Sequence, residues 1–445
     1  MKFPRRFFSA GLVLFALALM ALVSACGPGG DEATLQPQAT SVPTIPPTET
    51  PIPTPTATPL PTATPTPTST PTPTPTPLPD PAFPMKSTHF SYGICADLYY
   101  REDFDVTADD VMNYVDDLGM EWVRVQTSWA DLELAKGTYV WDNLDPIVAA
   151  VGDHNRKVLL SIIRAPAWAA GEEGCDEAGR CGMPADPNDL GDFLYELVNH
   201  YGGSVQAYEI WNEQNYAVEN AGYVDGAGRY VELLKVAYAR IKEANPYAYV
   251  LFGPLTPTGV NDPAIAIDDI TYLRQAYEYN GGEVKGYFDV LAAHTAGVHN
   301  RPDELWPDNP GDGPGWIDHP TFYFRHVENI RQVMVDYGED QKQIWLTEFG
   351  WASLEGISDT PAPGYEYAAH NSAVVQADYL PWALDIGRTQ YQPWLGAMFV
   401  WNLNYSTFNP GTDEKPPFSL LRPDWGTRPS YRSVQSYIEE HPTWP

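Results

Sequence analysis

From residue 85 onward, short runs of apolar residues alternate with longer segments in which apolar positions recur every three or four residues. The short runs predict buried β-strands, and the longer segments predict amphipathic helices. The expected strands are residues 89–95, 121–126, 157–163, 207–212, 249–253, 288–294, 344–349 and 396–402. Clear helical patterns include residues 230–245, 322–338 and 372–387. Eight strands that are each followed by a helix are typical of an α/β protein with a parallel sheet.

Several of these strands are apolar nearly throughout, which is typical of parallel strands covered by helices on both faces. Eight such units close naturally into a single (β/α)8 barrel, or TIM barrel. An open, doubly wound sheet is the alternative. Its dinucleotide-binding form is disfavoured because no GxGxxG motif opens a helix.

The first helix of this body has the clearest boundaries. Thr107 is expected to cap it, with Asp110 at the capping-box position, and Gly119 is expected to end it.

The first residues have the pattern of a targeting segment. Basic residues near the start precede an apolar run over 7–23 and then small residues, which predicts a signal peptide over 1–25. The ending LVSAC resembles a bacterial lipoprotein signal, which would make Cys26 a lipidated N-terminus. A plain signal peptide or an uncleaved membrane span is the alternative.

Residues 26–84 are expected to be a linker that begins at Cys26 and is dominated by Pro and Thr. Proline fixes φ and removes backbone donors, so such a run is expected to form an extended, disordered spacer. The folded body is expected over residues 85–445. Together these segments predict an exported protein at the cell surface or outside the cell, held to the membrane only through its lipid.

The formal net charge of −32 makes nucleic acid an unsuitable partner and a neutral substrate easier to accommodate. Cys175 and Cys181 lie close together in GCDEAGRCG, which in an exported protein predicts a disulfide. Zinc is the rival, but no further Cys or His cluster would complete the site, so no metal is expected. Cys95 has no evident partner and is expected to be a buried thiol.

Two predicted strands end in a glutamate. Glu213 follows the strand over 207–212, next to Asn212, and Glu348 lies at the end of the strand over 344–349. The carboxyl ends of barrel strands meet at the active-site mouth, so the fourth and seventh strands would present these two carboxyls to one central point. Two opposed carboxyls are the groups that cleave a glycosidic bond, one as acid and one as nucleophile or base.

Several motifs in this order and spacing carry a family resemblance. WNE at 211–213, TEFGW at 347–351 and FVWN at 399–402 resemble glycoside hydrolase clan A, the retaining (β/α)8 glycosidases, with families 39 and 5 nearest. The resemblance extends over roughly residues 88–435 and includes VRVQTSWADLE, KGTYVWDNLD and GTRPSYRSV.

The resemblance implies a role for each matching residue. Glu213 would be the acid/base and Glu348 the nucleophile. Asn212 would hold the sugar 2-hydroxyl, and Arg124 would hydrogen-bond the nucleophile. On this reasoning Glu213 needs a raised pKa, whereas Glu348 needs an ordinary or lowered one.

Further residues are candidates for the substrate-binding groove. By the resemblance, His294 would lie near the catalytic pair and Trp401 would be the platform under the sugar. Trp129 and Trp351 follow strand ends and could stack on sugar rings. Family 5 commonly has a Tyr two residues after this His, where this chain has Ala296, so a second contact to Glu348 is left unidentified.

The resulting hypothesis is a monomeric, retaining O-glycosyl hydrolase, β-xylosidase-like or endo-β-glycanase-like, that acts on β-linked glycans and needs no cofactor. A glycan-binding protein on a barrel scaffold is one alternative, although binding alone does not need two opposed glutamates. Transglycosylation by the same residues is another. An enolase-type metal barrel lacks the required carboxylates on consecutive strands.

Overall fold

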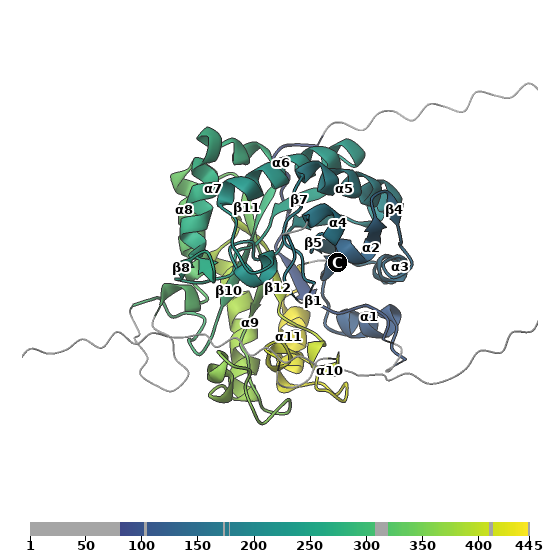
Figure 1. Ribbon diagram of the computed structural model, residues 1–445. Helices are drawn as coiled ribbons and strands as arrows, with labels where there is room; N and C mark the ends of the chain where they lie inside the picture. The colour runs from purple at the N-terminus through teal and green to yellow at the C-terminus, as the bar shows by residue number, and fades with distance from the viewer. Residues whose placement is uncertain are drawn as a thin grey trace, which may run out of the picture. The chain divides into compact units, whose positions relative to one another are not determined.

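Eight parallel strands close into a barrel at the centre of this computed structural model (Figure 1). The structure describes residues 81–101, 105–171, 174–177, 179–307, 319–408 and 413–443. The predicted signal peptide, the lipidated Cys26 and the linker up to residue 80 lie outside these residues.

The barrel strands follow chain order around the barrel, and each pairs in parallel with its neighbours. They are β1 (Ser91–Cys95), β2 (Trp122–Ser128), β5 (Lys157–Ile163), β6 (Ala207–Ile210), β7 (Tyr249–Phe252), β10 (Val290–Ala296), β11 (Gln343–Gly350) and β12 (Leu395–Val400). Two antiparallel pairs lie outside the barrel: β3 (Glu133–Ala135) with β4 (Thr138–Tyr139), and β8 (Asn261–Asp262) with β9 (Ala266–Ile267). The predicted (β/α)8 barrel and all eight of its strands are confirmed.

A helix connects each barrel strand to the next, and these helices surround the barrel (Figure 1). They are α1 (Ala108–Asp117), α3 (Asp145–Asp153), α5 (Pro187–Tyr201), α6 (Ala227–Ala244), α7 (Asp269–Glu278), α8 (His326–Asp336), α9 (Ala373–Gln390) and, after the last strand, α11 (Pro429–Glu440). Short helices α2 (Trp129–Leu132), α4 (Ala167–Ala170) and α10 (Tyr405–Phe408) follow strands at the carboxyl end of the barrel. Short 3₁₀ helices lie at Gly202–Ser204, Ala217–Asn220, Tyr279–Gly281, Glu283–Gly286, Pro320–Phe322, Glu366–Ala369 and Pro416–Phe418.

Local sequence accounts for the ends of α1. The Thr107 hydroxyl accepts a hydrogen bond from the Asp110 N–H, and the Asp110 carboxylate accepts one from the Thr107 N–H. This reciprocal pair is the predicted capping box. Gly119 follows the helix with φ +72°, a conformation that glycine adopts without steric cost.

Two apolar clusters hold the barrel together. The larger packs the outward faces of the strands against the helices. The smaller fills the barrel interior and includes Trp122, Leu159, Trp345 and Phe399. Because the amino-terminal part of the interior is filled in this way, ligand chemistry is confined to the carboxyl end of the strands.

The first described residues attach to the amino-terminal end of the barrel. The Met85 N–H donates to Asp289, directly before β10, at 3.2 Å. The Ser87 N–H donates to Gln343, the first residue of β11, at 2.8 Å. The chain therefore enters the barrel at the end opposite the carboxyl ends of the strands.

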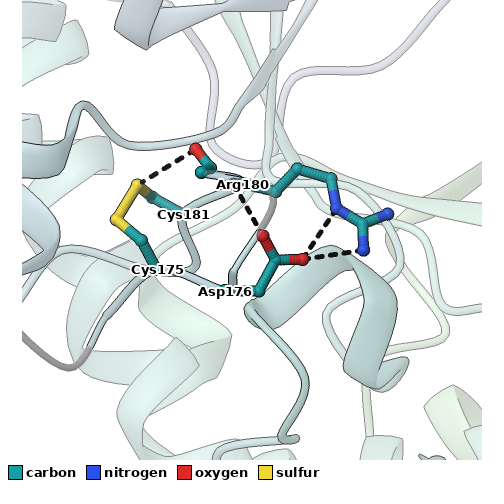
Figure 2. Close-up of a disulfide and its surroundings, with 5 residues drawn as sticks. Cys175, Asp176, Arg180 and Cys181 are labelled. Atoms are coloured by element: carbon teal, nitrogen blue, oxygen red, sulfur yellow. Dashed lines mark hydrogen bonds and ion pairs between the residues drawn. A yellow bond between two sulfur atoms is a disulfide. The ribbon is translucent and has the colours of Figure 1, made fainter. Parts of the chain in front are cut away.

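The predicted disulfide between Cys175 and Cys181 is confirmed, and it closes the loop between α4 and α5 (Figure 2). Beside it, Arg180 Nη2 lies 2.7 Å from Asp176 Oδ2. The Arg180 N–H also donates to Asp176 Oδ1, and the Asp176 N–H donates to Arg180 O. Cys95 is a buried free thiol, as predicted.

None of the helices in the described part of the chain combines the length and apolar character needed to cross a membrane.

Candidate active site

Glu213 lies on a tight turn that begins where β6 ends. Trp211 has φ +69° and Glu213 has φ +48°, both in the left-handed region that non-glycine residues rarely adopt. Neighbouring backbone fixes this turn, because the Trp211 N–H donates to Ile162 O and the Glu213 N–H to Pro254 O. Strained backbone that its surroundings enforce is concentrated at functional sites.

Gly253 lets β7 pass close to this turn. A Cβ at residue 253 would lie 2.3 Å from Ile210 O and 2.8 Å from Trp211 O, so a larger residue would displace the turn.

The two predicted catalytic carboxyls lie on either side of one imidazole ring. His294 Nδ1 is 2.9 Å from Glu213 Oε1, and His294 Nε2 is 3.6 Å from Glu348 Oε1. The Glu213 side chain is 20% exposed and that of Glu348 is 16% exposed, whereas that of His294 is 4% exposed. The predicted convergence of Glu213 and Glu348, with His294 next to both, is therefore present, and solvent reaches both carboxyls.

Arg124 makes the predicted contact with Glu348, with Nη1 donating to Oε1 at 2.6 Å. The residue lies in the middle of β2 rather than at its end, because the strand continues to Ser128. Its Nη2 also donates to Asn212 Oδ1 at 2.8 Å and to Ser161 Oγ at 3.2 Å. The Arg124 side chain is fully buried, so it contacts Glu348 and Asn212 and does not reach the substrate itself.

Burial raises the pKa of Glu213 to about 7, against the opposing effects of a hydrogen bond from Thr256 and the charge of Arg124. A carboxyl with this pKa is partly protonated near neutral pH, as a general acid requires. The predicted rise for Glu213 is therefore present.

The prediction of an ordinary or lowered pKa for Glu348 is wrong. Burial raises the pKa of Glu348, an effect that His294 and Arg124 only partly offset. Arg124 at 2.6 Å nevertheless supplies a cationic partner that favours the ionised carboxylate. Burial lowers the pKa of His294 to about 4, so Glu213 faces a neutral imidazole at neutral pH. Of the two carboxyls, Glu348 therefore has the environment that better supports a negative charge.

A neutral His294 carries one ring proton. When Glu213 is protonated, its hydroxyl can donate to Nδ1, and the remaining proton on Nε2 then points toward Glu348. This tautomer is compatible with an acid at Glu213 and an anion at Glu348.

The predicted aromatic contacts differ in accessibility. Trp401, at the end of β12, is partly exposed, and its ring centroid lies 5.0 Å from that of Tyr405. Trp129 and Trp351 are 0% and 1% exposed, so neither ring has a free face for a sugar. Trp129 stacks on Phe193, and the Trp351 indole N–H donates to Asn300 O, so both predictions of sugar contact are corrected.

Two residues near the site were missed from the sequence. Glu209 on β6 is fully buried and binds Arg124, and its signal was a lone carboxylate inside an otherwise apolar strand. Tyr405 in α10 has a pKa raised far above its ordinary value by burial, with further contributions from Asp97, Cys95 and Glu348. The Tyr405 ring centroid lies 5.0 Å from that of Trp401 at the mouth, so Tyr405 is a candidate for the second contact that the residue at 296 does not supply.

Within the described ranges, no group of three or more His, Cys, Asp or Glu side chains is arranged to hold a metal ion.

No family model matches the sequence. No curated protein matches it either. Solved structures do match the fold. A family 39 glycoside hydrolase from the gut symbiont Bacteroides cellulosilyticus is 22% identical with a TM-score of 0.56, and the match covers 78% of this chain and 63% of that one.

Two further structures show the same fold. A family 39 β-xylosidase from Caulobacter crescentus is 19% identical with a TM-score of 0.53, over 80% of this chain and 72% of that one. A family 5 glycoside hydrolase from Streptomyces cattleya is 13% identical with a TM-score of 0.54, over 80% of this chain and 82% of that one. At these identities the likeness establishes the (β/α)8 barrel but not the chemistry, which depends on the residues of the site.

Proposed function

We propose that this chain is a retaining glycoside hydrolase that cleaves β-linked glycans. One observation carries the proposal: two partly exposed carboxyls at the carboxyl ends of β6 and β11 lie on either side of His294, and among the described residues only Glu348 is ion-paired with an arginine or lysine. Burial raises the pKa of Glu213 to about 7, which suits an acid, and the contact from Arg124 suits a nucleophile at Glu348.

The reaction would proceed in two displacements. A carboxylate oxygen of Glu348 bonds to the anomeric carbon while the bond to the leaving oxygen breaks, and Glu213 gives its proton to that oxygen. Glu213, now a carboxylate, then takes a proton from water. The water oxygen bonds to the anomeric carbon as the ester to Glu348 breaks, which returns both carboxyls to their starting states.

The remaining residues would bind and orient the sugar. Asn212, whose Oδ1 accepts from Arg124, has its amide plane fixed by that bond and would hold the 2-hydroxyl. Trp401 would support the sugar ring at the point of cleavage, because it is the predicted aromatic residue with an exposed surface.

The test compares the full chain as wild type and as Glu348→Gly on a panel of aryl β-glycosides and β-glycans, with and without azide. Xylosides come first because a structure with the same fold is described as a β-xylosidase. We expect wild type to cleave a member of the panel and the variant to be inactive. Azide should restore turnover of the aryl glycoside by the variant and give the α-glycosyl azide, because the small nucleophile enters the space that the carboxylate leaves.

Full activity in the Glu348→Gly variant would remove Glu348 from the mechanism. A β-glycosyl azide would contradict retention through that residue. Wild type that binds a glycan on the panel but cleaves none would favour the glycan-binding alternative.

We further propose that the protein is exported, carries a lipid at Cys26 and acts as a monomer at the cell surface. The support for this location is the sequence pattern of residues 1–84. Labelling cells with a radioactive fatty acid tests it, since Cys26→Ala should abolish incorporation and release the protein from the membrane fraction. Incorporation that persists in the variant would contradict the assignment.

A further inference from the structure

Glu209 is a fully buried carboxylate to which the proposed reaction assigns no part. It lies on β6 and faces the barrel interior beneath the mouth. Its Oε1 accepts from Arg124 Nε at 3.0 Å and from Arg124 Nη2 at 2.6 Å. Its Oε2 has no hydrogen-bond partner among the described residues. One guanidinium thus lies between two carboxylates, Glu209 below and Glu348 at the mouth.

We propose that Glu209 is a positioning residue that acts through Arg124, keeping this buried cation paired and oriented while Glu348 changes from carboxylate to ester and back. The inference rests on the proposed function, because it concerns the same nucleophile.

The charge of Arg124 is the first reason for this role. A guanidinium whose side chain is 0% exposed needs a counter-charge, since an unpaired buried charge is strongly destabilising. In the glycosyl-enzyme Glu348 is an uncharged ester and can no longer supply one. Glu209 forms and breaks no bond in the reaction, so its carboxylate stays beside Arg124 throughout the cycle. It therefore lowers the cost of forming the intermediate.

Glu209 also orients Arg124. Two donors on one edge of the guanidinium bind Glu209, and Nη2 also donates to Asn212 and Ser161. These contacts fix the plane of the group and direct Nη1 toward Glu348. A change at residue 209 should therefore reach both the nucleophile and the amide proposed to hold the 2-hydroxyl.

Several charged or titratable groups surround Glu348: Arg124 from β2, His294 from β10, Glu213 from the turn after β6, Glu209 from β6, Cys95 from β1 and Tyr405 from α10. Replacing Glu209 by glutamine removes one anion from this group and leaves Arg124 without its permanent partner. The ionised form of Glu348 then gains stability, so its pKa should fall.

The kinetic test compares the full chain as wild type, Glu209→Gln and Glu121→Gln. Glu121 serves as the control because it too is a buried, ion-paired glutamate, with Lys157 at 2.7 Å, but it lies before the amino end of β2. In Glu209→Gln the amide oxygen can still accept from Arg124, so the orientation is kept while the charge is lost. The kcat/KM, which reports formation of the glycosyl-enzyme, should fall about tenfold, the loss that corresponds to stabilising the Glu348 carboxylate by one pKa unit. Breakdown of the intermediate should not slow, because the departing Glu348 carboxylate regains Arg124.

A merely structural role would slow both steps, so equal losses in formation and breakdown would overturn the inference. Unchanged kcat/KM in Glu209→Gln would overturn it as well. Glu121→Gln should leave both steps unchanged, and a similar loss in that control would assign the effect to the loss of any buried ion pair.

A second measurement does not depend on turnover. Glutamate labelled with ¹³C at the carboxyl carbon lets Glu348 be titrated by NMR, with Glu348→Gln providing the assignment. Glu348 should titrate at lower pH in Glu209→Gln than in wild type, and at the wild-type pH in Glu209→Asp, which keeps the charge. An unshifted titration in Glu209→Gln overturns the inference even if the protein cleaves nothing. A shifted titration in a protein without glycosidase activity would support the electrostatic coupling and reject the proposed function instead.

Discussion

Glu213→Gln should stabilise the fold at alkaline pH, even though it removes the proposed acid/base. Burial raises the pKa of Glu213 from 4.5 to about 7, and its side chain is only 20% exposed. Between these two pH values the folded chain keeps the Glu213 proton while the unfolded chain has lost it, so stability falls as the pH rises. A pKa shift of this size corresponds to about 3 kcal/mol of unfolding free energy, which wild type loses as the pH rises from below 4.5 to above 7.

Glutamine has the same shape, can donate to His294 and does not ionise. The difference in unfolding free energy between Glu213→Gln and wild type should therefore change with pH. It should favour the variant by about 2–3 kcal/mol more at pH 8 than it does at pH 5. Burial also raises the pKa of Glu219 to about 7, with Glu213 as the next contributor, so removing the Glu213 charge relieves Glu219 in the same direction. Urea unfolding followed by tryptophan fluorescence at the two pH values measures the difference.

Glu121→Gln is the control, because the pKa of Glu121 is shifted in the opposite direction. Burial alone would raise the pKa of Glu121, but hydrogen bonds from Lys157 and His89 lower it. The pKa of this carboxyl is lowered from 4.5, so its contribution to stability is lost only as the pH falls below that value, and the cost of its removal should be nearly the same at pH 8 and at pH 5. If the stability difference between Glu213→Gln and wild type is the same at both pH values, the carboxyl is not perturbed by burial and the assignment of Glu213 as the acid loses its basis.

Two further predictions concern the mouth of the barrel. The kcat/KM of wild type should decline as the pH rises through about 7, because Glu213 loses the proton that the leaving oxygen needs. A pH–rate profile checks this. Glu213→Gln should show no such decline in kcat/KM on an aryl glycoside whose leaving group needs no proton. If the decline persists in that variant, it must come from another group. Replacing Cys175 and Cys181 by serine should cost about 2 kcal/mol of stability, because a disulfide across six positions closes a short loop. Urea unfolding under non-reducing conditions measures this, and an unchanged midpoint would show that the loop stays ordered in the unfolded state or is held by other contacts.

The barrel could be predicted because its strands are short, apolar and regularly spaced. The strand over 157–163 was placed to the residue, since Lys157 and Arg164 bound its apolar run. The strand that carries His294 was predicted to end at that residue but continues to Ala296, after a register shift between Ala293 and His294. A bulge of this kind depends on pairing with a neighbouring strand, which no single segment encodes.

The site could be predicted only in part, because sequence order does not show which way a side chain points once a strand has ended. Trp129 and Trp401 both follow barrel strands, yet the first is buried and stacks on Phe193 of α5, whereas the second is partly exposed. Within a strand the alternation of sides is more reliable. Glu209 is two residues from Ala207, which lines the barrel interior, so counting by twos would have placed its carboxylate inside the barrel. Without that count, Glu209 was not identified from the sequence as the main counter-charge of Arg124.

The docking of residues 85–87 on the amino-terminal end of the barrel also bears on how the protein can be handled. Met85 and Ser87 are hydrogen-bonded to Asp289 and Gln343, so a fusion partner or solid support joined ahead of them is attached at the pole remote from Glu213 and Glu348. Immobilisation through that end would leave the mouth of the barrel open to long or insoluble polymers. A support coupled to the loops around Trp401 would instead obstruct it.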